Sequence, residues 1–502
     1  MDLLNEMQVG LAQALEFQAI FLMLAGTVLG MIVGATPGLS SGMAVAVLLP
    51  VTFGMTPLNG LIFLTSVYVS VTYGGSVTAI LLNTPGAPEN AATCLDGYPL
   101  TQQGRSAEAI GTAISSSVIG GTLSYIVMLV GIGAVAAVAL DFGPSEIFLI
   151  AIAGVAILGA VGNGSPLKIL ASGAFGLLIG TIGIVPTGEW RATFNEPFLA
   201  EGVQVVPVLI GAFVVSELME MAGRDYVVDA QVKGQQNLGN ILHAFANPFR
   251  HLWTVLRSSG VGMVIGLIPA AGATLAAFAS YSLTRRLSKD PDSFGKGNIS
   301  GIVAAESANN ACSGGALMTT LALGVPGSTT TAVLLGALTM HGLQAGPQLV
   351  YQQMPLVYGL IMAAIVSQIF MVAIAIGVGY GLSGALSVPT RILIPLLMLF
   401  SFLGAFALRN AVFDVDLMLL AGAFGYVMKR YGYSPSALVM GVILASIADN
   451  ELIRMFQLFG NDWYQEFFTR PLSLCLLIVV VGGMTHRLWW RGRPSEFEIA
   501  DE

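Results

Sequence analysis

Apolar segments of membrane-spanning length recur along almost the entire chain. A transmembrane α-helix needs about 20 consecutive, predominantly apolar residues. We expect spans at residues 17–36, 58–74, 109–139, 144–162, 166–184, 203–222, 258–281, 355–381, 391–408, 412–428, 435–447 and 471–490. Gly and Pro interrupt several of these segments, so the number of transmembrane helices stays open. The alternation of apolar and polar residues typical of a membrane β-barrel is missing. The pattern predicts an all-α polytopic membrane protein.

The composition agrees and excludes several classes of function. The 502 residues are 55% hydrophobic and only 10% charged, whereas a soluble domain is about 25% charged. The sequence has no basic patch for nucleic acid, and no P-loop, HExxH or GxSxG motif. Its three cysteines have no CxxC spacing and read as small apolar residues rather than transition-metal ligands. We therefore expect neither an enzyme nor a cofactor, and a process that needs energy would draw it from an ion gradient or another subunit.

The chain carries the same landmarks twice. Residues 30–37 (GMIVGATP) correspond to 262–269 (GMVIGLIP), and 73–86 (YGGSVTAILLNTPG) correspond to 313–327 (SGGALMTTLALGVPG) with one inserted residue. Because such landmarks keep their order, we predict an internal repeat. The predicted parts are a first repeat at 1–222, a cytoplasmic linker at 223–257, a second repeat at 258–470, and a final transmembrane helix with a cytoplasmic tail at 471–502.

The charges of the connecting loops predict that the two repeats are inverted. The positive-inside rule places Arg285, Arg286, Lys289 and Lys296 in the cytoplasm, whereas the matching turn at 53–58 has no charge. Equivalent turns thus prefer opposite sides of the membrane. This orientation puts the N-terminus in the periplasm and the C-terminus in the cytoplasm.

Pro-Gly motifs interrupt the apolar segments at four positions related by the repeat. Arg257 and Arg285 both favour the cytoplasm although only one span separates them, so we expect a re-entrant hairpin turning at 269–272 and its counterpart at 36–38. A second pair of tips is expected at 83–86 and 324–327. The alternative is a Pro-kinked helix or a surface turn. Inverted repeats with paired broken helices are typical of secondary transporters.

The broken helices supply candidate residues for an anionic substrate. The N-terminus of a half-helix presents free N–H groups and a positive dipole end, which suit a carboxylate. The alternative is that the hydroxyl groups only bond the preceding helical turn or a neighbouring helix. The candidate substrate-binding residues are Thr36, Pro37, Gly38, Ser40, Ser41, Thr84, Pro85, Gly86, Asn90, Pro326, Gly327, Ser328, Thr329 and Thr330.

A polar stretch of the second repeat, together with Asn83 of the first, supplies candidate cation ligands. Asn83, Glu306, Asn309 and Asn310 carry the oxygen ligands that hard cations prefer. A helix places Glu306 and Asn310 on one face, so we expect a buried acid with an amide partner that serves as an ion ligand or proton carrier. The alternative is a hydrogen bond that only holds helices together.

Four motifs together resemble one family. GATPGLSSG at 34–42, YGGSVTAILLNTPG at 73–86, ESANNACSGG at 306–315 and LGVPGSTTTAVLLGALTMHGLQAGP at 323–347 are similar to the large membrane subunit of the tripartite tricarboxylate transporter family, the TctA type. The resemblance implies a bacterial inner-membrane permease that works with a small membrane subunit and a periplasmic substrate-binding protein. It also implies carboxylate uptake driven by an ion gradient, with Na⁺ favoured, and an elevator-type mechanism.

Three functions remain open from the sequence. The first is ion-coupled uptake of di- or tricarboxylates or related organic acids, in which Glu306 permits either Na⁺ or H⁺. The second is a passive channel or facilitator for small anions. The third is a structural or receptor subunit of the membrane. The identity of the carboxylate is not encoded in these motifs, because the binding protein would select it.

Overall fold

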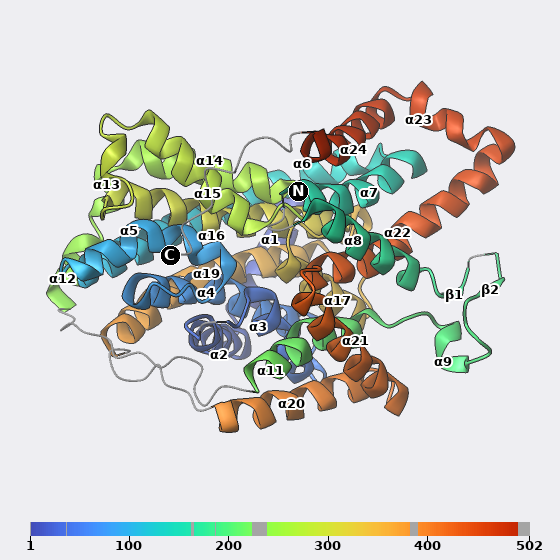
Figure 1. The fold of residues 1–502 in the computed structure, drawn as a ribbon, viewed down its shortest axis with the longest axis horizontal. Helices are drawn as coiled ribbons and strands as arrows, with labels where there is room; N and C mark the ends of the chain where they lie inside the picture. Colours follow the sequence, from blue (N-terminus) through green and yellow to red (C-terminus); the bar gives the residue numbers. More distant parts are fainter. Residues whose placement is uncertain are drawn as a thin grey trace. The chain divides into compact units, whose positions relative to one another are not determined.

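The computed structural model describes residues 2–36, 38–161, 165–185, 187–222, 238–381 and 390–489. Nearly all of them are helical (Figure 1). The described strands are β1 (Gly183–Ile184) and β2 (Trp190–Arg191), which pair antiparallel. The chain divides into two compact units, Met1–Asp141 with Gln204–Val427, and Phe142–Val203 with Met428–Glu502. Each unit draws on both predicted repeats, so the boundaries of the repeats and their inversion stay predictions.

The first unit contains most of the helices. Its N-terminal part comprises α1 (Asp2–Ala14), α2 (Phe17–Gly34), α3 (Ser41–Leu48), α4 (Pro57–Leu82), α5 (Ala91–Gln102) and α6 (Ser106–Leu140). Its later part comprises α10 (Val205–Leu209), a π-helix (Ile210–Val215), α11 (Ser216–Met221), α12 (Leu238–Ala244), α13 (Asn247–Arg250), α14 (Leu252–Leu267), α15 (Gly272–Leu287), α16 (Ile299–Leu323), α17 (Thr329–Met340), α18 (Pro347–Gln352), α19 (Met354–Gly381), α20 (Thr390–Ala407) and α21 (Val412–Arg430).

Glycines allow two helix pairs of this unit to pack closely. A β-carbon on Gly30 or Gly34 of α2 would lie 2.5 or 2.7 Å from main-chain oxygens of α4. A β-carbon on Gly262 or Gly266 of α14 would lie 2.2 or 2.3 Å from main-chain oxygens of α16. Small residues at such contacts let membrane helices approach. The two copies of the GMIVG-like motif therefore make the same kind of contact.

Both long polar helices end at the predicted breaks. Asn83 follows α4 with φ of 55°, and Gly324 follows α16 with φ of 73°. This left-handed conformation ends a helix and suits Gly and Asn. The Pro-Gly pairs come next, and a new helix starts at α5 or α17. The apolar segment expected at 258–281 likewise divides into α14 and α15 around the turn at 268–271.

The polar helix α16 lies inside the first unit. Every residue from Gly301 to Ala322 is buried, and α6, α14 and α15 pack against this helix. The expected spans did not include it, because its Glu and Asn residues lower its hydropathy. Protein rather than lipid surrounds these polar side chains, which is how ionisable groups occur at membrane depth.

The second unit is a smaller helical bundle with two partly buried ion pairs. It comprises α7 (Pro144–Val161), α8 (Pro166–Gly180), α9 (Pro197–Ala200), α22 (Pro435–Phe459), α23 (Glu466–Thr469) and α24 (Pro471–Trp489). Arg191 pairs with Asp449, and Arg470 donates to the buried Glu146 at 2.7 Å. These pairs join parts of the unit that are distant in sequence.

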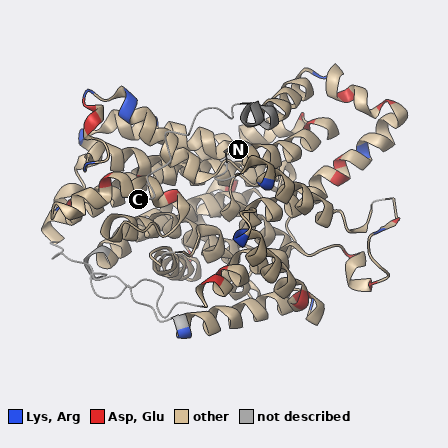
Figure 2. Cartoon of the chain, viewed as in Figure 1, with Lys and Arg blue, Asp and Glu red and all other residues tan. Residues whose placement is uncertain are grey.

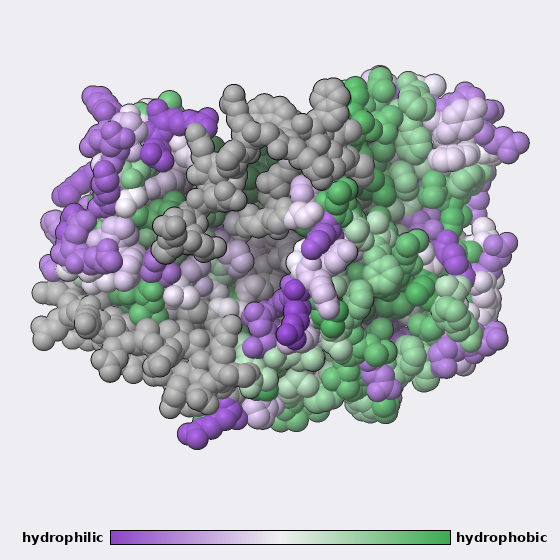
Figure 3. All heavy atoms as spheres, viewed as in Figure 1, coloured by the Kyte–Doolittle hydropathy of each residue, from purple (hydrophilic) through white to green (hydrophobic). Residues whose placement is uncertain are grey.

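The helices and the surface are those of a membrane protein. Among the described residues, five helices are long and apolar enough to cross a membrane: Phe17–Gly34, Pro57–Leu82, Ser106–Leu140, Met354–Val378 and Pro435–Thr469. Charged residues are sparse along the ribbon (Figure 2), and the face in Figure 3 carries broad hydrophobic areas. Large apolar side chains such as Val130 are exposed to 81%.

Candidate functional site

Glu306 is the centre of a buried hydrogen-bond cluster. Three hydroxyl groups from three other helices donate to its carboxylate, and each lies within the predicted first repeat. Ser76 of α4 donates to Oε1 at 2.6 Å, and Thr93 of α5 donates to the same oxygen. Ser117 of α6 donates to Oε2 at 2.7 Å. In the described part of the chain, no Lys or Arg forms an ion pair with Glu306. The carboxylate is thus solvated by hydroxyl groups alone.

Two asparagines beside this cluster leave their side-chain oxygens free. Asn90 donates through Nδ2 to the Thr72 carbonyl and to Ser76 Oγ, both at 2.8 Å. Asn309 donates through Nδ2 to the same Thr72 carbonyl at 3.4 Å. Both Oδ1 atoms are buried, and neither has a hydrogen-bond partner among the described residues. A buried acceptor without a donor costs about 1–3 kcal/mol, so these oxygens are suitable ligands for a cation.

The expected pairing of Glu306 with Asn310 is wrong in its details. Asn310 donates to the Glu306 main-chain oxygen at 3.2 Å, not to the carboxylate. Its own carbonyl accepts from Ser313, whose hydroxyl group lies 2.9 Å from the Tyr125 hydroxyl group. In an α-helix a side chain at position i+4 readily reaches the carbonyl of residue i. Asn310 therefore stabilises the polar helix, and the hydroxyl groups of other helices solvate the acid.

The predicted substrate tips of the two repeats come together at the starts of α3 and α17. A β-carbon on Gly42 would lie 3.5 Å from Thr329 Oγ1, and α3 packs against α17. Ser40 caps α3 by accepting from the Met43 N–H at 3.3 Å. Ser328 caps α17 by accepting from the Thr331 N–H at 3.2 Å. Two helix N-termini from the two predicted repeats therefore adjoin, while these two serine oxygens already serve as caps.

An acid that the sequence analysis did not select borders these tips. Ser41 donates a hydrogen bond to Glu89, which lies in the 3₁₀ turn Pro88–Asn90. A second acid is near, because a β-carbon on Gly38 would lie 3.7 Å from Glu217 Oε1. Glu89 directly follows the NTPGAP motif, and this position in the sequence could have identified it as a candidate site residue. The candidate anion site is therefore bordered by carboxylates.

The remaining candidates divide into buried and exposed groups. Gly86 is buried and donates its N–H to the Gly75 carbonyl at 3.1 Å, and the Pro326 carbonyl accepts from Ala270 at 3.2 Å. Gly327 and Thr330 are also buried. By contrast, Asn83 and Thr84 are exposed, and Thr36 and Thr84 bond carbonyls of their own segments. Pro85 is half-buried beside Gly86, and Pro37 lies outside the described residues. The structure thus does not bring Asn83 into the Glu306 cluster.

Asp96 anchors the loop that precedes the polar helix. Its Oδ1 accepts main-chain N–H groups of Gly295, Gly297 and Asn298 at 2.8–2.9 Å. Its Oδ2 accepts the Tyr281 hydroxyl group at 2.9 Å. Asp96 was not among the candidate residues of the sequence analysis. One buried carboxylate therefore links α5 to α15 and to the entry of α16.

Replacing Asp96 by alanine is expected to loosen this loop. Three N–H groups lose their acceptor, each at a cost of about 1–3 kcal/mol where it stays buried. Tryptic cleavage at Lys289 or Lys296, followed by mass spectrometry, should accelerate about tenfold or more, since 1.4 kcal/mol changes a local opening equilibrium about tenfold. Asp96→Asn retains an acceptor oxygen and should cleave at nearly the wild-type rate. Equal rates for the alanine and wild-type proteins would contradict the anchoring role.

Comparison with known proteins identifies the family. The profile of the tripartite tricarboxylate transporter TctA family matches residues 20–440. The chain belongs to the TctA family. A protein of Agrobacterium vitis described as an uncharacterized 52.8 kDa protein in the TAR-I ttuC' 3' region is 33% identical over 480 residues, 95% of each chain. A second protein of that species, described as uncharacterized in the TAR-II ttuC' 3' region, is 32% identical over 216 residues, 43% of this chain and 89% of that protein.

The family match confirms the resemblance that the four motifs carry. The matched range includes both sets of tips and the whole Glu306 cluster. TctA-family proteins are components of tricarboxylate transporters, so this chain is a transporter component in a membrane rather than a member of an enzyme family.

Proposed function

We propose that this TctA-family protein is the permease subunit of a carboxylate uptake system driven by an ion gradient. It would act in the bacterial inner membrane with a small membrane subunit and a periplasmic substrate-binding protein. The observation that supports coupling most directly is the Glu306 carboxylate, buried beside two free amide oxygens. A purely structural or receptor subunit has no need of such a group, because buried ionisable residues are costly in membranes.

The adjoining starts of α3 and α17 are the proposed carboxylate site. Their main-chain N–H groups and dipole ends favour an anion. Glu89 and Glu217 border the same place, and both would repel a carboxylate. Substrate binding at these tips therefore requires positive charge from co-bound cations, which gives a physical reason for coupling.

The proposed cation ligands are Glu306 and the side-chain oxygens of Asn90 and Asn309. Hard cations such as Na⁺ take oxygen ligands, and these buried side chains carry oxygen atoms. This set keeps Glu306 and Asn309 from the predicted cation ligands, omits Asn83 and Asn310, and adds Asn90 from the predicted substrate residues. Na⁺ is the proposed coupling ion, and H⁺ carried by Glu306 is the alternative.

Replacing Asn309 by alanine is expected to weaken the response to Na⁺. Loss of one ligand should raise the Na⁺ concentration for half-maximal uptake about tenfold, which corresponds to about 1.4 kcal/mol. Uptake measured across a Na⁺ series checks this result. Asn461→Ala removes an exposed asparagine of the second unit and should leave the Na⁺ response unchanged. Identical Na⁺ responses of the two variants would remove Asn309 from the ligand set.

Reconstituted vesicles provide the test of the whole proposal. They should contain both membrane subunits and receive carboxylate-loaded binding protein under an imposed Na⁺ or pH gradient. We expect accumulation against the substrate gradient only when an ion gradient is present. A passive channel would equilibrate the substrate without coupling, and transport without the binding protein would contradict its proposed role. Labelling of single cysteines from each side would test the proposed periplasmic N-terminus and cytoplasmic C-terminus.

A further inference from the structure

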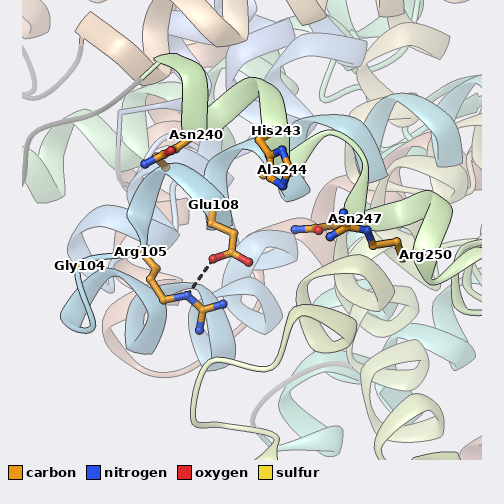
Figure 4. Close-up of a pocket in the computed structure, with 9 residues that line it drawn as sticks. Gly104, Arg105, Glu108, Asn240, His243, Ala244, Asn247 and Arg250 are labelled. Carbon is orange, nitrogen blue, oxygen red and sulfur yellow. Dashed lines mark hydrogen bonds and ion pairs between the residues drawn. The ribbon is translucent and has the colours of Figure 1, made fainter.

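A surface pocket lies at one end of the first unit, apart from the Glu306 cluster. Its cavity volume is about 300 Å³, and its lining comes from the α5–α6 turn and from α12 and α13. Figure 4 shows Arg105, His243, Asn247 and Arg250 around it, with Glu108 joined to Arg105. Gly111 lets α12 lie against α6, because a β-carbon there would lie 2.2 Å from the Ile241 carbonyl. The pocket is therefore formed by close packing of a short helix on a long one.

The polar lining suits an anion. Arg105 is already paired with Glu108 at 2.8 Å, which offsets its charge. Arg250 is exposed, and the described part of the chain shows no carboxylate paired with its guanidinium group. Asn240 adds an exposed amide and His243 an exposed imidazole. Arg250 can thus bind a phosphate without breaking an existing ion pair. The planar guanidinium group of arginine can donate two parallel hydrogen bonds to phosphate oxygens.

Exposed apolar side chains neighbour several lining residues in the sequence. Leu242 precedes His243 and is 52% exposed, and Phe249 precedes Arg250 and is 68% exposed. Trp253 at the start of α14 is 81% exposed. Aromatic side chains of this kind concentrate at the membrane interface. An occupant with a charged head and apolar tails would match both the polar lining and these exposed apolar side chains.

The pocket also lies at the end of the unit that carries the loop with Lys289 and Lys296. Gln103, in the α5–α6 turn, donates to the Lys296 carbonyl at 2.8 Å. His251, which follows Arg250, lies 3.1 Å from the Ser300 hydroxyl group through Nδ1. The loop at 288–298 with Lys289 and Lys296 is therefore at the same end. The positive-inside rule places this end in the cytoplasm, where anionic lipids attract basic segments.

We propose that this pocket binds the phosphate headgroup of an acidic phospholipid from the cytoplasmic leaflet, with Arg250 as the principal contact. The acyl chains would lie along Leu242, Phe249 and Trp253. This site is independent of substrate transport, so its test does not depend on the proposed function.

Native mass spectrometry of the purified full-length chain tests the proposal. Phosphatidylglycerol and phosphatidylcholine are added in equal amounts, and the retained lipid is measured. We expect phosphatidylglycerol to be retained preferentially, and Arg250→Gln to reduce its retention about fivefold or more, as loss of about 1 kcal/mol implies. Arg286→Gln, which removes an exposed arginine of α15 outside the pocket lining, is the matched control and should retain lipid normally.

Three outcomes would overturn the proposal. The first is equal retention of the two lipids by the wild-type protein. The second is equal loss of phosphatidylglycerol in the Arg250 and Arg286 variants, which would indicate a diffuse charge effect. The third is full competition by inorganic phosphate at the same concentration as the lipid, which would indicate a site for small anions. A melting curve for each variant checks folding. Arg250→Lys keeps the positive charge and should retain more phosphatidylglycerol than Arg250→Gln.

Discussion

Replacing Glu306 by glutamine is expected to abolish coupled uptake while the helices stay folded. Glutamine has nearly the same volume and can still accept the hydroxyl groups of Ser76 and Thr93 through its oxygen. The hydroxyl group of Ser117 can reverse its role and accept from the new amide. Only the negative charge is removed. Coupling free energies of about 1–3 kcal/mol correspond to about 5–150-fold in affinity, so stimulation by the ion gradient should fall by up to about a hundredfold.

The measurement compares initial uptake rates with and without a Na⁺ gradient, at equal amounts of inserted protein. Glu306→Ala serves as the contrasting variant, because it leaves three buried hydroxyl groups without their acceptor. Each such loss costs about 1–3 kcal/mol, so this variant should also melt at a lower temperature. Wild-type uptake by the glutamine variant would show that the charge of Glu306 has no part in coupling.

Replacing Gly86 by alanine is expected to displace the first Pro-Gly tip. A β-carbon at this position would lie 2.1 Å from the Gly34 carbonyl oxygen and 2.4 Å from Gly75 Cα. Both atoms belong to the main chain and cannot rotate away, so the tip itself must move. Overpacking of this kind costs about 1–3 kcal/mol. We expect uptake to fall about tenfold or more, with a lower melting temperature.

The repeat supplies a second test of the same contact. A β-carbon on Gly327 would lie 2.6 Å from both the Gly266 carbonyl oxygen and Ala316 Cα, so Gly327→Ala should show a related loss. Gly54→Ala is the matched control, since no atom lies within 4 Å of its added β-carbon. If Gly86→Ala and Gly54→Ala transport equally well, the close approach at the tip is not required.

Helix positions were largely predictable from the sequence, because they follow local patterns. The segment expected at 355–381 corresponds to α19, and the segment at 412–428 corresponds to α21. Pro-Gly motifs marked the ends of α4 and α16, since proline and glycine act on the main chain at their own positions. The polar helix α16 was the exception, because hydropathy alone does not recognise a helix that protein covers on all sides.

The partners of Glu306 were much harder to predict. The acid itself was selected because carboxylates are rare in apolar sequence, but Ser76, Thr93 and Ser117 were not. A hydroxyl group in a membrane helix usually bonds its own preceding turn, as Ser115 does with Gly111. Only the packing of helices that are distant in sequence distinguishes a serine that solvates an acid. Glu89 was missed because no sequence pattern shows that Ser41 lies beside it.

The cluster around Glu306 also limits which helices can slide past one another during transport. Its carboxylate joins α16 to α4, α5 and α6 through three hydrogen bonds among buried side chains. Separating α16 from these helices would break all three at once. In a transporter that alternates between two states, we expect these four helices to move together as one rigid body. The sliding surface would then lie outside the contacts that α16 makes with α4, α5 and α6.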